Sequence, residues 1–336
     1  MSTTTAAPSP EHFFNTLQAY QRTAALRAAV DLDLFTAIGG GAATVPAIAA
    51  ACSASERGTR ILCDYLTIIG FLTKTGDRYA LTQDTAVFLT KGSPAYFGDA
   101  VAFLASPEIV GHFQNLSATI RRGFVPKETS TVSDENPVWQ TFARVMMPMM
   151  TMPAQSIAET LGVAGAGPLK VLDIAAGHGI FGIAIAQRNP QAEVVAVDWA
   201  GVLTVATENA AKMGVAARHS VLAGDAFKVD WGSGYDIALM TNFLHHFNAE
   251  TCTTLLKKVG AALKTGGRIA ILEFVPNEDR VSPLGSATFA LQMLGNTPDG
   301  DAYTFSELSA MLKAAGFSTA TSHPTPGAET LVVGTK

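Results

Sequence analysis

The chain has 336 residues, a length that accommodates two domains with separate hydrophobic cores. Hydrophobic residues make up 48% of it and charged residues only 15%, which excludes an intrinsically disordered protein. Its 23 basic and 28 acidic side chains give a net charge of −5, which argues against nucleic acid as the main partner.

Membrane and secretion signals are missing from the sequence pattern. No apolar run reaches the roughly 18 residues that indicate a membrane span. Residues 1–10 lack the basic and apolar regions of a signal peptide. Cys52, Cys63 and Cys252 have neither metal-binding nor redox spacing, so we expect reduced, buried thiols. These features predict a cytoplasmic protein with no membrane partner and no bound metal.

Helical periodicity dominates the first 70 residues. Apolar residues recur near 3.6-residue spacing over residues 13–38, and a glycine triplet follows, so one helical stretch is expected. A short helix is predicted over residues 45–52. Ser53 and Glu56 have the spacing of a capping box, which predicts the start of a further helix that ends at a glycine.

A hairpin completes this region. Residues 71–73 and 79–81 flank a polar Lys-Thr-Gly-Asp turn, a pattern typical of two paired strands. Two short helices followed by a two-stranded wing form a winged-helix unit, which we place in residues 1–95.

A winged helix raises the possibility of a DNA-binding regulator. The helix that would enter the groove, over residues 53–70, carries only Arg57 and Arg60 as basic residues, next to Glu56 and Asp64. This is a poor set of phosphate contacts, so we expect no nucleic-acid partner.

Residues 96–160 are interpreted as a helical connector that includes substrate-pocket helices. The polar stretch 133–137 interrupts it, and the helix after Trp139 is rich in methionine over residues 146–152. Thioethers are soft ligands, so a Cu(I) site is one interpretation. An adaptable apolar pocket wall is the interpretation we favour, with ordinary core as a further alternative.

The C-terminal region, residues 161–336, alternates strands with helices, which predicts a mostly parallel sheet with right-handed crossovers. A clear helix follows Asn248 and is expected to stop at the Gly266–Gly267 pair. The expected strands are 170–174, 193–197, 218–222, 235–241, 268–274, 319–323 and 330–335.

A glycine turn follows the first of these strands. Gly177, Gly179 and Gly182 match G-x-G-x-x-G, and Asp198 ends the next strand about 20 residues later, as in NAD-binding proteins. However, Asp173 lies immediately before the turn, where its charge would repel a diphosphate. This acid favours a nucleoside ligand that has no diphosphate.

A further acid ends the third strand, in the segment Gly224-Asp225-Ala226-Phe227, where it could meet an adenine amino group and ring. With these motifs, residues 169–336 resemble a class I S-adenosylmethionine-dependent methyltransferase. The whole chain resembles the O-methyltransferase family of plant phenolic methylation and bacterial natural-product pathways. Ala175 and Ala176 stand where many members have glycine.

The resemblance implies an α/β fold: a Rossmann-like, seven-stranded methyltransferase domain preceded by a mostly α-helical winged-helix dimerisation domain, in a homodimer. It implies S-adenosylmethionine as cofactor, with Asp173 and Gly177 at the methionine end. Asp198 would accept the ribose hydroxyls and Asp225 the adenine amino group. The alternatives are a turn cap for Asp173 and a helix N-cap for Asp198. The expected cofactor residues are Asp173, Gly177, Gly179, Asp198, Trp199, Asp225, Ala226, Phe227 and Asn242.

Two histidines follow the fourth strand, at the sheet edge where ligands bind in such folds. A hydroxyl becomes a good nucleophile only as its proton leaves, so a base with a pKa near neutrality helps. The resemblance implies that His245 is this base and that the carboxylate of Glu273 orients it. A second family carboxylate falls on Ala302 in this chain.

Other interpretations of the histidine pair stay open. His245 and His246 could pack the floor of the site while proximity alone drives methyl transfer to oxygen, nitrogen or carbon. A non-catalytic binding protein on the same scaffold is a further alternative. No metal is expected, because adjacent side chains rarely chelate one ion.

The expected acceptor is a small aromatic or apolar hydroxyl compound. Phe142, Met146 and Met150 recur at four-residue spacing, so they share one helix face, and aromatic and methionine side chains after the fifth strand could close the other side. The predicted pocket residues are Phe142, Met146, Met150, His246, Phe289 and Met293.

Overall fold

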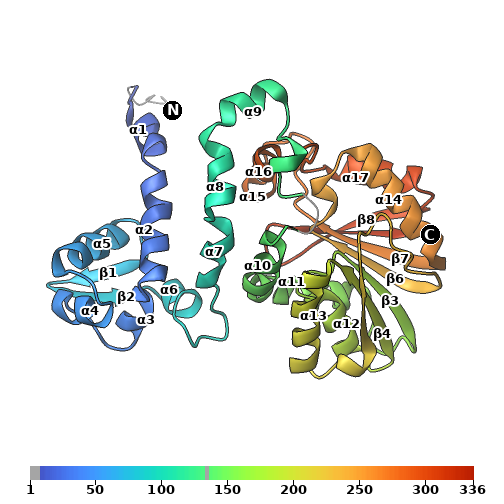
Figure 1. Cartoon of the computed structure of the whole chain (residues 1–336), viewed down its shortest axis with the longest axis horizontal. Coiled ribbons are helices and arrows are strands. Elements are labelled where there is room, and N and C mark those ends of the chain that lie inside the picture. Colours follow the sequence, from blue (N-terminus) through green and yellow to red (C-terminus); the bar gives the residue numbers. More distant parts are fainter. Residues whose placement is uncertain (1–7, 133–135) are drawn as a thin grey trace, which may run out of the picture. The chain divides into compact units, whose positions relative to one another are not determined.

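A computed structural model describes residues 8–132 and 136–336, so part of the interruption expected at 133–137 lies outside the described residues. The chain divides into two compact units, Met1–Ser106 and Pro107–Lys336 (Figure 1). Among the described residues, no helix is both long enough and apolar enough to cross a membrane.

The helical stretch predicted over residues 13–38 is three helices rather than one. They are α1 (Glu11–Leu17), α2 (Tyr20–Asp31) and α3 (Leu34–Gly39). Asp33 adopts a left-handed conformation with φ of 53°, which ends α2 and turns the chain into α3. Helix α1 buries no residue, whereas α2 and α3 supply Ala29, Leu34, Phe35 and Ile38 to the core of this unit.

The predicted winged-helix unit is confirmed. An antiparallel wing follows two short helices, and the pairing of Leu72 with Leu81 sets its register. The elements are α4 (Val45–Ala51), α5 (Glu56–Ile68), β1 (Leu72–Thr75), β2 (Arg78–Leu81) and α6 (Gln83–Phe88), with η1 (Gly98–Ala100) and α7 (Val101–Leu104) after them.

The cap of α5 differs from the prediction. Ser53 has a φ of 51° and does not cap the helix. Ser55 is the N-cap, and its Oγ accepts the backbone N–H of Gly58 at 3.1 Å. Both serines lie just before the helical apolar pattern, so the sequence pattern alone does not show which of them is the N-cap of α5.

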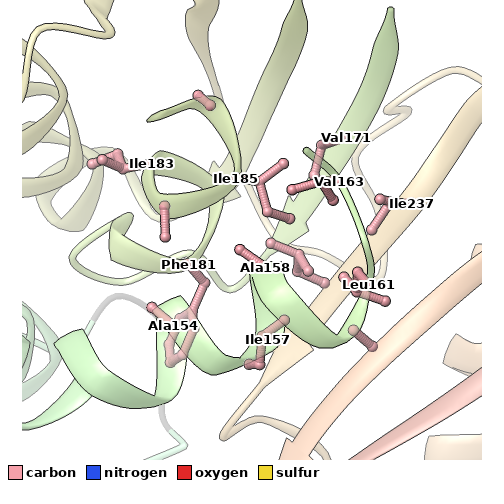
Figure 2. Close-up of a cluster of buried hydrophobic side chains, with 14 of the residues drawn as sticks. Ala154, Ile157, Ala158, Leu161, Val163, Val171, Phe181, Ile183, Ile185 and Ile237 are labelled. Carbon is pink, nitrogen blue, oxygen red and sulfur yellow. The ribbon is translucent and has the colours of Figure 1, made fainter. Parts of the chain in front are cut away.

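The second unit begins with helices α8 (Pro107–Gln114), α9 (Leu116–Arg122), η2 (Lys127–Thr129), α10 (Val138–Val145) and α11 (Met147–Thr160). Helix α11 packs against α12 (Ile180–Arg188) through the cluster in Figure 2, in which Ala154 and Ile157 face Phe181. Met150 belongs to this cluster whereas Met149 and Met152 are exposed, so the methionine-rich segment has core and surface positions.

A seven-stranded sheet forms the centre of this unit, as predicted. Its order is β5-β4-β3-β6-β7-β9-β8, with the first five strands parallel and β9 antiparallel to both neighbours. The strands are β3 (Leu169–Ile174), β4 (Ala192–Asp198), β5 (His219–Ala223), β6 (Tyr235–Thr241), β7 (Leu263–Glu273), β8 (Thr319–Pro324) and β9 (Thr330–Thr335).

Helices cover both faces of the sheet. Val171 and Ile237 pack with α11 and α12, whereas the alternating neighbours Leu172 and Ala238 pack with helices on the other face. The remaining elements are α13 (Ala200–Lys212), η3 (Ala216–Arg218), η4 (Leu244–His246), α14 (Ala249–Ala262), α15 (Leu284–Ala287), α16 (Phe289–Asn296) and α17 (Phe305–Ala314).

The strand order reverses beside β3, because β4 and β5 lie on one side of it and β6 and β7 on the other. The carboxyl ends of β3 and β6 therefore lie at a switch point of the sheet, which is where ligands bind in such folds. One prediction near this region is wrong in detail. Helix α14 ends at Ala262, and Gly266 lies within an irregular start of β7 rather than at the helix end.

Candidate active site

The glycine turn after β3 requires special backbone geometry. Gly177 and Gly179 have φ of 57° and 74°, and Gly179 is the N-cap of α12. A Cβ added to Gly182 would lie 2.7 Å from Val194 Cγ1 and 2.9 Å from Asp173 Oδ2. The third glycine of the motif thus lets α12 pack closely on β3 and β4.

Asp173 is fully buried at the end of β3. Its Oδ2 accepts the backbone N–H of Gly182 at 3.1 Å, whereas Oδ1 has no partner among the described residues. Burial raises the pKa of Asp173 to about 8, the Gly182 N–H lowers it, and the charge on Asp198 raises it further. Asp173 holds the turn together and still has one free carboxyl oxygen.

Asp198 connects the ends of two adjacent strands. Its Oδ2 accepts the N–H of Gly177 at 2.8 Å, and its Oδ1 accepts the N–H of Trp199 at 2.7 Å. Burial raises the pKa of Asp198 to about 6, although both N–H groups lower it. The N-cap of α13 is Trp199, which makes no side-chain cap, and the Trp199 ring packs on the start of that helix.

The segment after β5 carries an acidic and an aromatic side chain, Asp225 and Phe227. Asp225 Oδ1 accepts the N–H of Phe227 at 2.9 Å. Burial acts to raise the pKa of Asp225, but Lys228 and this N–H outweigh it, so the pKa is lowered. The carbonyl of Ala226 accepts from Lys258 Nζ at 2.9 Å, and the Phe227 ring lies 5.0 Å from that of Phe247.

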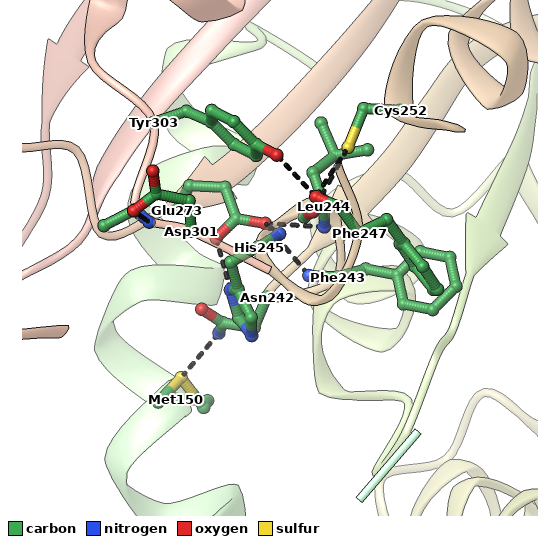
Figure 3. Close-up of polar contacts among 11 residues, drawn as sticks. Met150, Asn242, Phe243, Leu244, His245, Phe247, Cys252, Glu273, Asp301 and Tyr303 are labelled. Atoms are coloured by element: carbon green, nitrogen blue, oxygen red, sulfur yellow. Dashed lines mark hydrogen bonds and ion pairs between the residues drawn. The ribbon is translucent and has the colours of Figure 1, made fainter. Parts of the chain in front are cut away.

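His245, the middle residue of η4, and Glu273, the last residue of β7, are both buried (Figure 3). The imidazole Nδ1 lies 2.5 Å from Glu273 Oε2. Glu273 Oε1 accepts the backbone N–H groups of Phe243 at 3.0 Å and Leu244 at 2.8 Å. All these partners can donate, so Glu273 acts as an acceptor throughout. In this contact the neutral tautomer of His245 has its proton on Nδ1 and its lone pair on Nε2.

His246 is surrounded by rings. Its centroid lies 4.3 Å from that of His245 and 5.0 Å from that of Trp139, and its Nδ1 has no partner among the described residues. Burial, and then His245, lower the pKa of His246 well below its usual value. The residue is therefore neutral, and its ring lies against those of His245 and Trp139.

The predicted pocket residues come from three segments. The Phe289 ring lies edge-on to His245, with centroids 4.8 Å apart. Asn242, held at a φ of 53°, donates from Nδ2 to Met150 Sδ at 3.8 Å. Phe142 lies 5.8 Å from Trp139 between ring centroids. Two others are also buried, Met146 at the start of α11 and Met293 in α16.

Two residues near the site were not predicted from the sequence. His178 lies between two motif glycines, and its Nδ1 accepts the N–H of Ile180 at 3.3 Å. Burial lowers the pKa of His178 to about 4. Its place between Gly177 and Gly179 in the glycine motif is a sequence signal that could have identified it. The other is Glu329, which is buried just before β9 and has no sequence signal of its own.

Ala302 is buried, and its methyl side chain supplies no carboxylate. The adjacent Asp301 is turned to other partners. Its Oδ1 accepts the N–H of Ala302 at 2.8 Å, and its Oδ2 lies 3.6 Å from a guanidinium nitrogen of Arg280.

Comparison with known proteins identifies the family. Residues 125–318 match the model of the O-methyltransferase domain, and residues 14–91 match the O-methyltransferase dimerisation domain. The chain belongs to the O-methyltransferase family. It is 28% identical to the 3-hydroxy-5-methyl-1-naphthoate 3-O-methyltransferase of Streptomyces sahachiroi, over 94% of this chain and 92% of that protein.

Solved structures agree with this assignment. A protein from Nostoc punctiforme that was assigned as an O-methyltransferase has a TM-score of 0.94 and 50% identity, covering 98% of this chain and all of that one. Human N-acetylserotonin methyltransferase in complex with S-adenosylmethionine shares the fold, with a TM-score of 0.84 and 22% identity, covering 100% of this chain and 99% of that one. The cofactor of this O-methyltransferase is S-adenosylmethionine, and the chain is an enzyme.

The residues at this edge of the sheet fit this cofactor. Asp173 has an unpartnered carboxyl oxygen, and the carboxylate of Asp198 lies close by, so the site presents acidic oxygen acceptors. A sulfonium cation gains from such an environment, whereas a diphosphate would be repelled.

Proposed function

We propose that this enzyme methylates the hydroxyl group of a small aromatic or apolar molecule, with His245 as the general base. The observation that carries the proposal is the contact between His245 Nδ1 and Glu273 Oε2. It fixes the tautomer so that Nε2 has a lone pair, which is what a hydroxyl proton needs.

The chemistry follows from this arrangement. When bound, S-adenosylmethionine would supply an electrophilic methyl group and leave as S-adenosylhomocysteine, because the methyl–sulfur bond breaks with its electron pair kept on sulfur. His245 Nε2 takes the proton of the acceptor hydroxyl as the oxygen forms its bond to carbon. Glu273 keeps the imidazole oriented and stabilises the positive charge that it gains.

We assign the cofactor contacts by chemistry and position. Asp198 would accept the ribose hydroxyls, because each of its oxygens has a lone pair beyond those used by the backbone N–H groups. Asp225 would accept from the adenine amino group, with Phe227 against the ring. Asp173 and Asn242 each have a buried, unpartnered oxygen available to the methionine end.

The acceptor site suits a flat, apolar molecule. Phe289, Trp139 and His246 provide ring faces and edges around His245, and Met150 adds a flexible apolar contact. Met152 is 63% exposed, so the methionines of α11 do not all converge on one point. This spread favours the apolar wall over a Cu(I) site.

We further propose a homodimer formed through the N-terminal unit. Its match to a dimerisation domain supports this, and so does the exposed apolar surface of α1 and the start of α2. The large side chains on that surface are Phe13, Phe14, Leu17 and Tyr20.

A panel of matched acceptors tests the proposal. The purified enzyme would be incubated with S-adenosylmethionine and a naphthol, the corresponding naphthylamine and the naphthol methyl ether, with products identified by mass spectrometry and NMR. We expect methylation on oxygen alone and no reaction of the ether. Equal methylation of the amine, or of a ring carbon in the ether, would contradict the assigned acceptor atom.

A further inference from the structure

A second carboxylate lies close to the catalytic histidine, and it comes from an unexpected part of the chain. Glu329 is 7% exposed and immediately precedes β9. The next residue, Thr330, pairs with Glu273 in the antiparallel ladder between β9 and β7. The ladder register therefore brings Glu329 next to the end of β7, where Glu273 holds His245.

The segment that carries Glu329 is fixed on both sides. Thr325 Oγ1 donates to the Glu329 carbonyl at 2.7 Å. Ser286 Oγ, from α15, donates to the carbonyl of Ala328 at 2.7 Å. A Cβ added to Gly327 would lie 3.1 Å from Glu329 Oε2, so the turn is folded closely over the carboxylate. The carboxylate thus has little freedom to turn outward.

The charges around Glu329 identify its neighbours. Burial raises the pKa of its carboxyl, and the charge on Glu273 raises it further. Its own backbone N–H, His245 and a hydrogen bond from the Asn242 side chain act in the opposite direction. His245, Glu273 and the Asn242 amide are therefore the groups that act on the Glu329 carboxyl, in agreement with its place next to the end of β7.

We propose that Glu329 is a positioning residue for methyl transfer and serves as the second buried carboxylate beside His245. It supplies from the β9 edge the negative charge that Ala302 does not supply. When the acceptor hydroxyl passes its proton to His245 Nε2, the imidazole becomes positive. Glu273 holds the Nδ1 proton, and Glu329 stabilises the new charge through space. This inference rests on the proposed role of His245 as base.

Glu329→Gln is the decisive variant, because glutamine keeps the volume and can still accept a hydrogen bond from Asn242 but carries no charge. We expect kcat to fall about 10- to 100-fold, which is a modest electrostatic loss. We expect the Kd for S-adenosylhomocysteine, measured by calorimetry, and the Tm to stay near the wild-type values. The acid limb of the pH profile of kcat/KM should move to lower pH, because an imidazole without this carboxylate loses its proton more readily.

Two further variants serve as controls for Glu329→Gln. Glu329→Asp keeps the charge and should recover part of kcat and the wild-type acid limb. Glu307→Gln removes a carboxylate that caps α17 and pairs with Arg280, so it should lower the Tm and leave the pH profile unchanged. If Glu329→Gln does not fold, Glu329→Ala replaces it, and an acid limb that stays at the wild-type pH in this uncharged variant would assign Glu329 a structural role and overturn the proposal.

His245→Ala separates this inference from the proposal beneath it. Unchanged kcat and pH profile in Glu329→Gln, with His245→Ala inactive, would overturn the role of Glu329 alone. Wild-type turnover in His245→Ala would overturn both. A loss in Glu329→Gln that is matched by equal losses of cofactor affinity and Tm would also count against the proposal.

Discussion

Glu273 sets both the tautomer of His245 and the path of the chain that carries it. One oxygen lies 2.5 Å from His245 Nδ1, while the other accepts the backbone N–H groups of three consecutive residues, Phe243, Leu244 and His245. The carboxylate therefore ties the end of β7 to the loop after β6. A change at Glu273 affects geometry and protonation together, and suitable variants separate the two.

Glu273→Gln should remove the catalytic function and keep the fold. Glutamine Oε1 can still accept the backbone N–H groups, but its amide presents donors to His245 Nδ1. The imidazole then has to carry its proton on Nε2, the atom that must be free. We expect kcat to fall about 10²–10⁴-fold, as for other bases held in the wrong tautomer.

Glu273→Ala leaves several buried N–H groups unpaired and should also lower the free energy of unfolding in urea by on the order of 3 kcal/mol. Equal free energies of unfolding for Glu273→Gln and Glu273→Ala would contradict the view that glutamine still holds the backbone N–H groups.

Gly300 should not tolerate a side chain. A Cβ at this position would lie 2.2 Å from the carbonyl oxygen of His245 and 2.6 Å from Thr297 Oγ1. Gly300→Ala should therefore displace the histidine loop, lower stability by about 1–3 kcal/mol and reduce turnover about 10²-fold. Gly111→Ala is the matched control, because a Cβ on that helical glycine meets no atom within 4 Å. A fully active Gly300→Ala enzyme would show that the loop does not constrain His245.

Cofactor binding should depend on the ionisation of Asp198. Burial raises the pKa of this carboxyl to about 6, so a growing fraction is protonated below that pH. A protonated carboxyl is a poorer acceptor for ribose hydroxyls, so calorimetry should give a Kd for S-adenosylhomocysteine that rises up to about tenfold per pH unit below 6. Asp198→Asn should bind more weakly at neutral pH and lose this dependence. Wild-type affinity in Asp198→Ala would remove the residue from the site.

Asp173 should make the unliganded enzyme less stable as pH rises. Its folded pKa is about 8, above the usual value near 4, so the folded state holds a proton that the unfolded chain releases. This contribution to stability is complete below pH 4 and is lost as pH rises toward 8. Asp173→Asn keeps an acceptor for the N–H of Gly182 and removes the titration. The Tm of the wild type should therefore fall more between pH 5 and pH 8 than that of the variant, and parallel curves would contradict the assignment.

Most of the sheet could be predicted from the sequence, because buried apolar runs bounded by glycine and polar residues define strands well. The predicted strand 235–241 agrees with β6 in full. Helix boundaries were harder to predict. The left-handed conformation of Asp33 and the choice of Ser55 over Ser53 depend on the tertiary path of the chain.

Part of the candidate site could be predicted from the sequence, and part depends on tertiary structure. Asp173, Asp198, His245 and Glu273 lie at or just after the carboxyl ends of parallel strands, and topology alone brings such ends to one edge. Glu329 precedes an antiparallel strand instead. Its place beside His245 depends on the register between β7 and β9, which no local pattern reveals.

The most direct test of the account is the turnover of His245→Ala at saturating S-adenosylmethionine, measured beside its affinity for S-adenosylhomocysteine. His323→Ala, which changes a histidine of the outer strand β8, is the control and should match the wild type. We expect His245→Ala to lower kcat about 10²–10⁴-fold with an unchanged cofactor Kd. Wild-type turnover with an unchanged Kd would contradict general-base catalysis and leave proximity as the source of methyl transfer.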